Sequence, residues 1–174
     1  AYGRTDPEGR TYGEELARIG WKGTEEVGAR RMHAYYELHI EQGPILEAEG
    51  RQIGVVTHCQ GLWWLEFALT GRAAHTGSTP MAMRINAGLS MARIIEMVQE
   101  VAMAAQPDAM GGVGQARFLP NSRNVLPGSV VFTVDLRSPD QAKLDALRAE
   151  VEARAPTICA EQGRGLRGGG GGAF

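Results

Sequence analysis

The sequence has little that would direct it to a membrane, to nucleic acid or to an oxidising compartment. No apolar run approaches the roughly 18 residues of a membrane-spanning helix, and no signal peptide is visible. A formal net charge of −2 gives no electrostatic reason to bind nucleic acid or an anionic membrane. The two cysteines, Cys59 and Cys159, lie far apart and outside any CxxC pattern, so we expect free thiols and a cytoplasmic protein.

Glycine is in excess. The chain has 24 glycines, and five of them form the run at residues 168–172. Such a stretch has no side chains with which to form a core, so residues 164–174 are predicted to be a disordered tail. Otherwise, 43% hydrophobic and 22% charged residues are typical of soluble globular proteins, and 174 residues suffice for one or two small domains.

A helix is predicted near the N-terminus. Thr11, followed three residues later by Glu14, is a capping box. Leu16 and Ile19 give the helix a short apolar face, which ends at Gly20. Because a helix this short is marginal alone, we expect it to need a partner surface outside this chain.

Residues 37–44, Glu-Leu-His-Ile-Glu-Gln-Gly-Pro, form the most informative stretch. Leu38 and Ile40 alternate with two glutamates and His39, so a strand would place both carboxylates and the imidazole on one face. A neutral imidazole beside carboxylates suits zinc, nickel or manganese. From the residues alone, His39 is a metal ligand or a histidine that is hydrogen-bonded at a strand edge.

The stretch that follows is predicted to lead to a second domain. Residues 45–50 favour a helical turn and residues 53–57 an apolar strand. Residues 58–61, His-Cys-Gln-Gly, break this pattern and are predicted to be a hinge. We therefore place a first domain at residues 1–60, a second at 61–163 and the tail at 164–174.

The second domain begins with a strand, a helix and two further strands. Alternation predicts strands at residues 62–70 and 130–137, and a weaker pattern favours another at 113–119. A helix over residues 85–105 is predicted from apolar positions that recur every three or four residues, at Leu89, Ala92, Ile95, Val98 and Ala102.

A second helix is predicted after residue 138. Ser138 is the expected N-cap, with Pro139 at the first helical position and Gln141 completing a capping box. Its predicted buried stripe is Leu144, Leu147, Val151, Ala155 and Ile158. The element order is five sixths of a ferredoxin-like βαββαβ unit, an α+β fold with an open-faced sheet and two helices. We expect its final strand to be missing, because the glycine tail stands in its place.

Two further segments present polar side chains to a ligand. Residues 71–81, Gly-Arg-Ala-Ala-His-Thr-Gly-Ser-Thr-Pro-Met, place His75 on a loop, where an imidazole can donate to a developing oxyanion; the alternative is an ordinary exposed histidine. Arg137 lies on the polar face of its strand, and its planar guanidinium suits bidentate binding of a carboxylate. The alternative for Arg137 is an ion pair with Asp135. The Trp63-Trp64 pair is expected to pack on the sheet or at a subunit interface.

Several of these motifs together resemble one family of metallohydrolases. They are residues 37–47, residues 71–81, residues 121–128 (Asn-Ser-Arg-Asn-Val-Leu-Pro-Gly) and residues 135–137. These are similar to N-carbamoyl-L-amino-acid hydrolases and their relatives, the beta-ureidopropionases and allantoate amidohydrolases. All belong to the aminoacylase/carboxypeptidase-like dinuclear metalloenzymes. The resemblance extends from about Tyr12 to about Gly163.

The resemblance implies roles for five residues of this chain. His39 is implied to be a ligand of the dinuclear metal centre. Gln42 is implied to contact the substrate near the metals, with a turn amide bonded to the backbone as the alternative. His75 is implied to stabilise the oxyanion in the active site of the partner subunit. Arg137 is implied to clamp the substrate carboxylate, with Asn124 as its hydrogen-bonding neighbour.

The resemblance also implies an activity. The family hydrolyses the carbamoyl C–N bond of a linear ureido acid, most simply an N-carbamoyl-L-amino acid, with two divalent metal ions that activate water. The metals implied are zinc, manganese, cobalt or nickel. Residues 1–60 are implied to be an edge piece of the α/β metal-binding catalytic domain, and the second domain a lid and a homodimerisation domain. Because only His39 is matched to a metal ligand, we expect this chain to be a fragment that is inactive alone.

Other interpretations stay open. The chain can be a dimerisation or interaction module without catalysis, or its substrate can be allantoate or β-ureidopropionate. A ferredoxin-like nucleic-acid-binding domain shares the topology. That class is disfavoured because the chain lacks the aromatic and basic string of an RNA-recognition motif and a basic surface.

Overall fold

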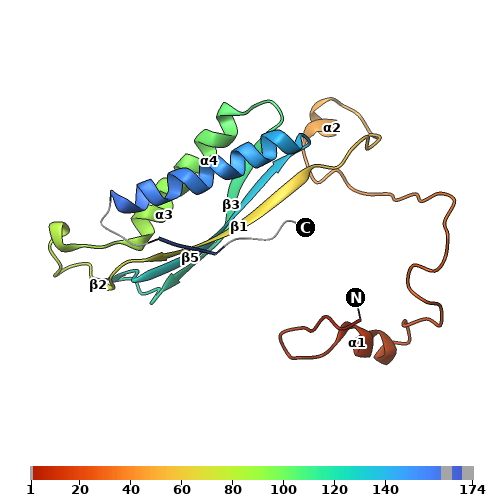
Figure 1. The fold of residues 1–174 in the computed structure, drawn as a ribbon, viewed down its shortest axis with the longest axis horizontal. Coiled ribbons are helices and arrows are strands. Elements are labelled where there is room, and N and C mark those ends of the chain that lie inside the picture. Colours follow the sequence, from red (N-terminus) through yellow and green to blue (C-terminus); the bar gives the residue numbers. More distant parts are fainter. Residues whose placement is uncertain (1, 162–165, 170–174) are drawn as a thin grey trace. The chain divides into compact units, whose positions relative to one another are not determined.

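The computed structural model describes residues 2–161 and 166–169 and divides the chain into an N-terminal unit, Ala1–Gly54, and a C-terminal unit, Val55–Phe174 (Figure 1). Within the described residues, no helix is long and apolar enough to cross a membrane. The N-terminal unit contains two helices, α1 (Tyr12–Arg18) and α2 (Ile45–Ala48). None of residues 2–54 is buried.

The capping box predicted at the start of α1 is confirmed. Glu14 N donates to Thr11 Oγ1 at 3.2 Å, and Thr11 N donates to Glu14 Oε2 at 2.8 Å. The carboxylate of Glu14 also accepts from the Thr11 hydroxyl at 2.7 Å. The two bonds that the carboxylate accepts, from the Thr11 backbone first and then from its hydroxyl, lower the pKa of Glu14. The helix ends before Gly20, whose φ of +75° is the left-handed conformation that glycine adopts without strain.

The helical turn predicted over residues 45–50 is also confirmed. The carboxylate of Glu41 accepts hydrogen bonds from Ile45 N and Leu46 N at 3.1 Å, and these are donors that the first turn of a helix leaves unsatisfied. Gln42, between Glu41 and the helix, adopts a left-handed conformation with φ +56°. The turn is therefore built from local contacts.

The strands predicted at residues 37–41 and 53–57 are wrong, because neither stretch forms a strand. The apolar side chains of Leu38 and Ile40, and those of Val55 and Val56, are all exposed. A strand is stabilised by hydrogen bonds to a neighbouring strand and by an apolar face that packs against a core. Within the described residues neither stretch has such a neighbour, so alternation alone does not make them strands.

The C-terminal unit is the expected ferredoxin-like fold (Figure 1). Its sheet contains β1 (Gly61–Thr70), β3 (Met110–Leu119), β5 (Ser129–Ser138) and β6 (Leu166–Gly169) in the order β3-β5-β1-β6, with every pair antiparallel. Two helices, α3 (Ala87–Ala104) and α4 (Gln141–Ala160), cover one face of the sheet. A separate two-stranded ribbon joins β2 (Ala74–His75) to β4 (Val125–Leu126), and a short 3-10 helix η1 (Met81–Met83) precedes α3.

The prediction that the final strand is missing is wrong. Strand β6 lies within the glycine tail and pairs with residues 66–69 of β1. Without it, this edge of β1 would have no neighbouring strand among the described residues. Backbone N–H and C=O groups make the ladder and need no side chains, so a glycine-rich segment can supply them. The rest of the predicted disordered tail, residues 164–165 and 170–174, lies outside the described residues.

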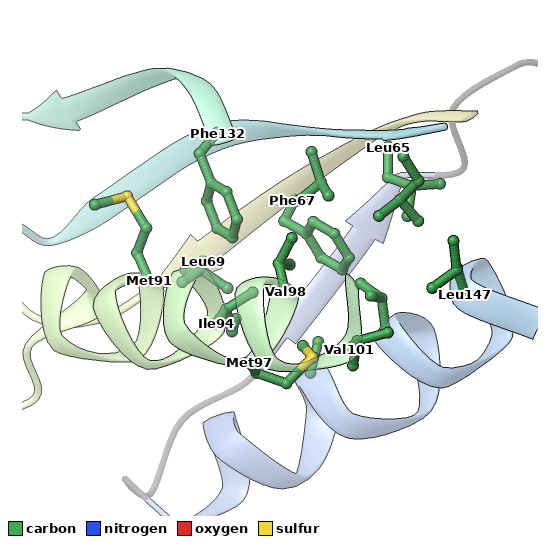
Figure 2. Packing of buried hydrophobic residues seen from close by; sticks show 14 of the residues in the cluster. Leu65, Phe67, Leu69, Met91, Ile94, Met97, Val98, Val101, Phe132 and Leu147 are labelled. Carbon is green, nitrogen blue, oxygen red and sulfur yellow. The ribbon is translucent and has the colours of Figure 1, made fainter. Parts of the chain in front are cut away.

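The core lies between the sheet and the two helices. Figure 2 shows Phe67 and Phe132 of the sheet pointing toward Ile94 and Val98 of α3. The two phenylalanine rings stack with their centroids 5.4 Å apart. The alternation predicted for β1 and β5 is confirmed, because their inward residues are buried and form one continuous cluster with α3 and α4: Leu65, Phe67, Leu69, Val130, Phe132, Val134 and Leu136.

The stripe predicted for the first helix is partly wrong. Val98 and Ala102 of α3 are buried, whereas Leu89 and Ile95 are 42% and 38% exposed. The helix carries two overlapping sets of apolar positions, and the set that contains Met91, Ile94 and Val101 faces the sheet. Tertiary packing decides which of the two sets is buried, and the spacing of apolar residues in the sequence gives no information about that packing.

The second helix begins later than predicted. Ser138 is the last residue of β5, and Asp140 is the N-cap of α4, with its carboxylate accepting from Lys143 N at 3.1 Å. Ser138 instead accepts from Asp140 N at 3.2 Å. The predicted stripe is otherwise confirmed: Leu144, Leu147, Val151 and Ala155 are buried with Cys159, and Ile158 packs beside them.

Candidate functional site

The structure brings two of the predicted site residues, His75 and Asn124, to one end of the C-terminal unit. His75 is in β2, and its Cα pairs with that of Val125 in β4. Thr76 then donates two hydrogen bonds to the carbonyl oxygen of Asn124, from its backbone N at 2.9 Å and from its hydroxyl at 3.0 Å. We call β2, β4 and the loop at residues 76–79 the tip ribbon. Figure 1 shows β2 at the end of the sheet.

Two glycines allow the chain to converge at the base of the tip ribbon. Gly71 N donates to Gly128 O at 2.8 Å. A Cβ at Gly71 would lie 2.6 Å from Ile85 O, and one at Gly128 would lie 2.9 Å from Ala73 N. Both distances are shorter than van der Waals contact with backbone atoms, so these positions need glycine for packing.

The imidazole of His75 is exposed, as a residue that reaches a ligand must be. Gly77 N donates to its Nδ1 at 3.1 Å. Asn124 is also exposed, and its side-chain Oδ1 accepts from the Ser122 hydroxyl at 3.0 Å. The tip ribbon therefore presents an imidazole and an amide, each held by a local hydrogen bond.

Arg137 lies at the other end of the sheet. It pairs with Leu62 at the start of β1, whereas Ser129, next to the tip ribbon, pairs with Thr70 at the end of β1. Eight residues of β5 separate Arg137 from Ser129, roughly 26 Å at about 3.3 Å per residue. The expectation that Asn124 is the neighbour of Arg137 is therefore wrong within one copy of the chain, because the sheet lies between them.

The ion pair considered for Arg137 is confirmed. Its Nε donates to both carboxylate oxygens of Asp135 at 3.1 Å, and its Nη2 donates to Asp135 Oδ2 at 2.8 Å. These hydrogen bonds, with the Coulomb attraction of the carboxylate, raise the pKa of Arg137. The Arg137 side chain is still 43% exposed. Asp135 engages Nε and Nη2 of the guanidinium, and within the described part of the chain no hydrogen bond involves Nη1.

His39 and Gln42 belong to the N-terminal unit. Both are exposed, and the Nδ1 of His39 contacts its neighbour's carbonyl, Ile40 O. Glu41, expected on the same strand face as His39, caps α2 instead. Among the described residues no group of three or more histidine, cysteine, aspartate or glutamate side chains could hold a metal ion. The side chains around His39 therefore do not form a metal site by themselves.

Sequence reasoning missed three residues that support the tip ribbon, namely Arg84, Thr76 and Ser122. Arg84 is half-buried and donates to two carbonyl oxygens, Thr79 O at 2.9 Å and Thr76 O at 2.6 Å. The acceptors are main-chain atoms, which leave no side-chain pattern in the sequence. Only the nearness of Arg84 to the motif at 71–81 could have drawn attention to it.

Trp63 contacts two side chains of the C-terminal unit. Trp63 donates to Asp145 Oδ1 at 3.2 Å, and the Arg148 guanidinium lies 4.0 Å from its ring centroid. Both contacts are with side chains of α4, and Trp63 is partly buried against the core. Cys59 and Cys159 are free thiols, as expected.

Comparison with known proteins adds independent findings. Residues 57–162 match the family described as the peptidase dimerisation domain. The chain is 76% identical over 165 residues, 95% of its length and 40% of the relative, to the N-carbamoyl-L-amino-acid amidohydrolase of Rhizobium meliloti. It is 35% identical over 133 residues, 76% of the chain and 32% of the relative, to the allantoate amidohydrolase of Escherichia coli.

A solved structure gives the same result. The chain is similar to an amidase of the hydantoinase/carbamoylase family from Burkholderia multivorans, with a TM-score of 0.85 and 44% identity, over 99% of this chain and 42% of that one. The chain thus spans about two fifths of the length of the Rhizobium meliloti amidohydrolase and of the Burkholderia multivorans amidase.

Proposed function

The chain belongs to the peptidase dimerisation domain family, among the hydantoinase/carbamoylase amidases, and from this premise we propose that it is the lid and dimerisation part of an amidohydrolase. The proposed substrate is an N-carbamoyl-L-amino acid. One water adds to the ureido carbon and the C–N bonds of that carbon break, which gives the L-amino acid, CO2 and ammonia. The free thiols support a cytoplasmic location.

Three residues of the C-terminal unit are proposed to handle the substrate. Arg137 binds the substrate carboxylate through the side of its guanidinium that does not face Asp135. His75 donates a hydrogen bond to the oxyanion that develops when water attacks the ureido carbon. Asn124, held beside His75 by Thr76, supplies an amide donor next to it.

Two residues of the N-terminal unit are also proposed to have roles in the reaction. His39 is proposed as one ligand of a divalent metal ion whose other ligands are residues that this chain does not supply. Gln42 is proposed to contact the substrate. A metal of this kind, when bound, lowers the pKa of water and so supplies the nucleophile. Its identity among zinc, manganese, cobalt and nickel is left to measurement.

The metal proposal predicts what the isolated chain binds. After dialysis against micromolar zinc or manganese, elemental analysis should find almost no metal per chain, both in the wild type and in His39→Ala. Two metal ions per wild-type chain, lost on replacing His39, would contradict the proposal that the site needs other residues.

The separation of His75 from Arg137 is the main observation that supports this proposal. Arg137 lies roughly 26 Å along β5 from Ser129, which is next to the tip ribbon that carries His75, whereas a carbamoyl amino acid is only several bonds long. One copy of the chain therefore cannot place both residues on one substrate molecule. If both act on the substrate, the site combines Arg137 of one copy with His75 and Asn124 of another, which is what a dimerisation domain permits.

The surface proposed for dimerisation is the edge of the sheet formed by β3 and the adjacent side of α3. Among the described residues no strand pairs with the outer edge of β3. Large apolar side chains are exposed at both ends of β3 and along α3, at Met110, Leu119, Leu89, Ile95 and Met103. An unpaired strand edge beside an apolar helix side suits a second copy of the same surface.

A hybrid enzyme tests the activity. In it, this chain replaces the matching 165-residue segment of the Rhizobium meliloti amidohydrolase. The hybrid should hydrolyse N-carbamoyl-L-amino acids, and His75→Ala should lower kcat by about a hundredfold or more, as loss of an oxyanion donor does. A folded hybrid without activity would contradict the proposal. Faster hydrolysis of allantoate or β-ureidopropionate would assign one of those substrates instead.

Sedimentation of the chain tests the dimer and the non-catalytic alternative. We expect a dimer that Leu89→Glu with Ile95→Glu converts to a monomer, because two charges would enter the proposed interface. Ile53→Glu with Val55→Glu, at side chains that are 83% and 86% exposed, is the matched control and should stay dimeric. A dimer together with an inactive hybrid would favour an interaction module without catalysis.

A further inference from the structure

A single side chain holds the loop that follows His75. The guanidinium of Arg84 donates to Thr76 O at 2.6 Å through Nη2 and to Thr79 O at 2.9 Å through Nε. The two acceptors are the first and last residues of the loop at 76–79. Thr79 N also donates to His75 O at 3.2 Å, which closes the loop on itself. Arg84 thus joins both ends of the loop, and its half-buried position limits competition from water.

The same loop is bonded to Asn124. Thr76 receives a hydrogen bond from Arg84 on its carbonyl and donates from its N and its hydroxyl to Asn124 O. A shift of Thr76 therefore moves Asn124 together with the loop. The chain of contacts runs from Arg84 through Thr76 to Asn124, and all of these distances are 3.0 Å or less.

The loop also determines which nitrogen of His75 carries the hydrogen. Gly77 N donates to Nδ1 at 3.1 Å, and only an imidazole nitrogen without a hydrogen can accept. The neutral ring is then the Nε2–H tautomer, with its donor on the nitrogen away from the loop. A side chain at Gly77 would place Cβ 3.1 Å from His75 Cε1, so the ring would have to move by a few tenths of an ångström to make room for it.

From these contacts we infer that Arg84 is a positioning residue for His75 and Asn124. It fixes the loop so that Gly77 N reaches Nδ1, which keeps His75 as an Nε2–H donor, and so that Asn124 stays beside it. The planar fork of arginine reaches two carbonyl oxygens in fixed directions, which a lysine ammonium does not reproduce. The tautomer is a property of the chain itself; only its use in catalysis rests on the proposed function.

Nitrogen NMR of the imidazoles tests the inference on the full chain, without a metal or a substrate. At a pH where the ring is neutral, the His75 signal, identified by its loss in His75→Asn, should show a hydrogen on Nε2 and none on Nδ1. Arg84→Lys should give a mixture of both tautomers. Arg93→Lys is the control, because Arg93 makes only a surface ion pair to Glu161 at 3.6 Å, and it should match the wild type.

A second NMR measurement tests the inference on the wild type alone and so does not depend on whether a variant folds. Scalar coupling across the hydrogen bond from Arg84 Nε to the Thr79 carbonyl should be detectable. Absence of this coupling, an Nδ1–H tautomer in the wild type, or an unchanged tautomer in a folded Arg84→Lys chain would each overturn the inference.

Kinetics of the hybrid enzyme separate this inference from the proposed function. Arg84→Lys should lower kcat about tenfold to a hundredfold, the usual effect of a small displacement of a reacting group, with a smaller change in KM. If the hybrid is inactive, the proposed function fails while the tautomer result still decides the role of Arg84. If the hybrid is active and Arg84→Lys changes neither kcat nor the tautomer, the inference fails alone.

Discussion

The two units of the chain form their elements in different ways. In the N-terminal unit none of residues 2–54 is buried. Its two helices begin at local hydrogen bonds, one between Thr11 and Glu14 and the other accepted by the carboxylate of Glu41. In the C-terminal unit, side chains from three strands and two helices share one core, in which Phe132, Val130 and Val134 are almost fully buried. Local hydrogen bonds are thus enough to start a short helix, whereas every sheet strand of this chain depends on distant partners.

The difference matters for function as well. The N-terminal unit carries His39 and Gln42 on exposed backbone, while the C-terminal unit holds His75 and Asn124 on a ribbon that glycines and Arg84 fix in place. A site needs groups that are held in a definite geometry. The C-terminal unit therefore provides preformed parts of a site, and the proposed metal ligand His39 needs further residues around it.

From this difference between the two units, we expect the largest effect of a substitution on stability in the core of the C-terminal unit. Phe132→Ala removes a ring that stacks on Phe67, and we expect it to lower the free energy of unfolding of the C-terminal unit by about 3–5 kcal/mol. Leu38→Ala, at an exposed position of the N-terminal unit, should change it by less than about 0.5 kcal/mol. Urea unfolding followed by tryptophan fluorescence and circular dichroism measures both. Equal losses in the two variants would contradict the comparison.

A smaller effect is expected at the base of the tip ribbon. Gly71→Ala places a Cβ 2.6 Å from Ile85 O, so the backbone must shift, at a cost of about 1–3 kcal/mol. Gly112→Ala, where a Cβ meets no atom within 4 Å, is the matched control and should leave unfolding nearly unchanged. If Gly71→Ala unfolds like the wild type, the close packing at Gly71 does not hold the tip ribbon.

In the N-terminal unit the effects should be limited to one helix. Thr11→Ala removes the hydroxyl that caps α1 and should destabilise this helix by about 1 kcal/mol. Amide chemical shifts of α1 measure its helix content, and those of the C-terminal unit should not change. A change that extended to the core residues would show that the two units are energetically coupled.

Acid should act on the same helix. The pKa of Glu14 is lowered in the folded state, by hydrogen bonds from Thr11, below its ordinary value of 4.5. The stabilisation is therefore complete above pH 4.5 and is lost as the pH falls through the lowered pKa. A pH titration of α1 amide shifts should show this loss. Glu14→Gln should reduce the pH dependence and leave the part due to Glu15, whose pKa is lowered by the hydrogen bond from Arg18. A helix that strengthens in acid would refute the capping box.

The sequence predicted elements that rest on local signals, and it missed features that depend on distant partners. The capping box at Thr11, the turn at residues 45–48 and the alternation of β1 and β5 were predictable because each signal is local and agrees with its surroundings. The strand at residues 37–41 was wrong because alternation describes two faces without supplying a neighbouring strand. Strand β6 was not predicted for a different reason. Its ladder with β1 uses only backbone atoms, so it leaves no apolar pattern in the sequence.

Some features of the candidate site could be predicted from the sequence and others could not. The exposure of His75 and Asn124 could be predicted from their glycine-flanked motifs. Their separation from Arg137 could not, because it depends on the register between β1 and β5. The role of Arg84 was also out of reach, since it bonds main-chain oxygens whose positions only the folded loop defines.

The most direct test of a site shared between two copies is complementation between two inactive hybrids. One hybrid carries His75→Ala and the other Arg137→Ala, and the two are co-expressed so that subunits mix. Half of the dimers then combine one subunit of each kind and contain one site with both native residues, so we predict about one quarter of the wild-type activity. A mixture as inactive as each parent would contradict the account, because His75 and Arg137 would then have to act within one copy.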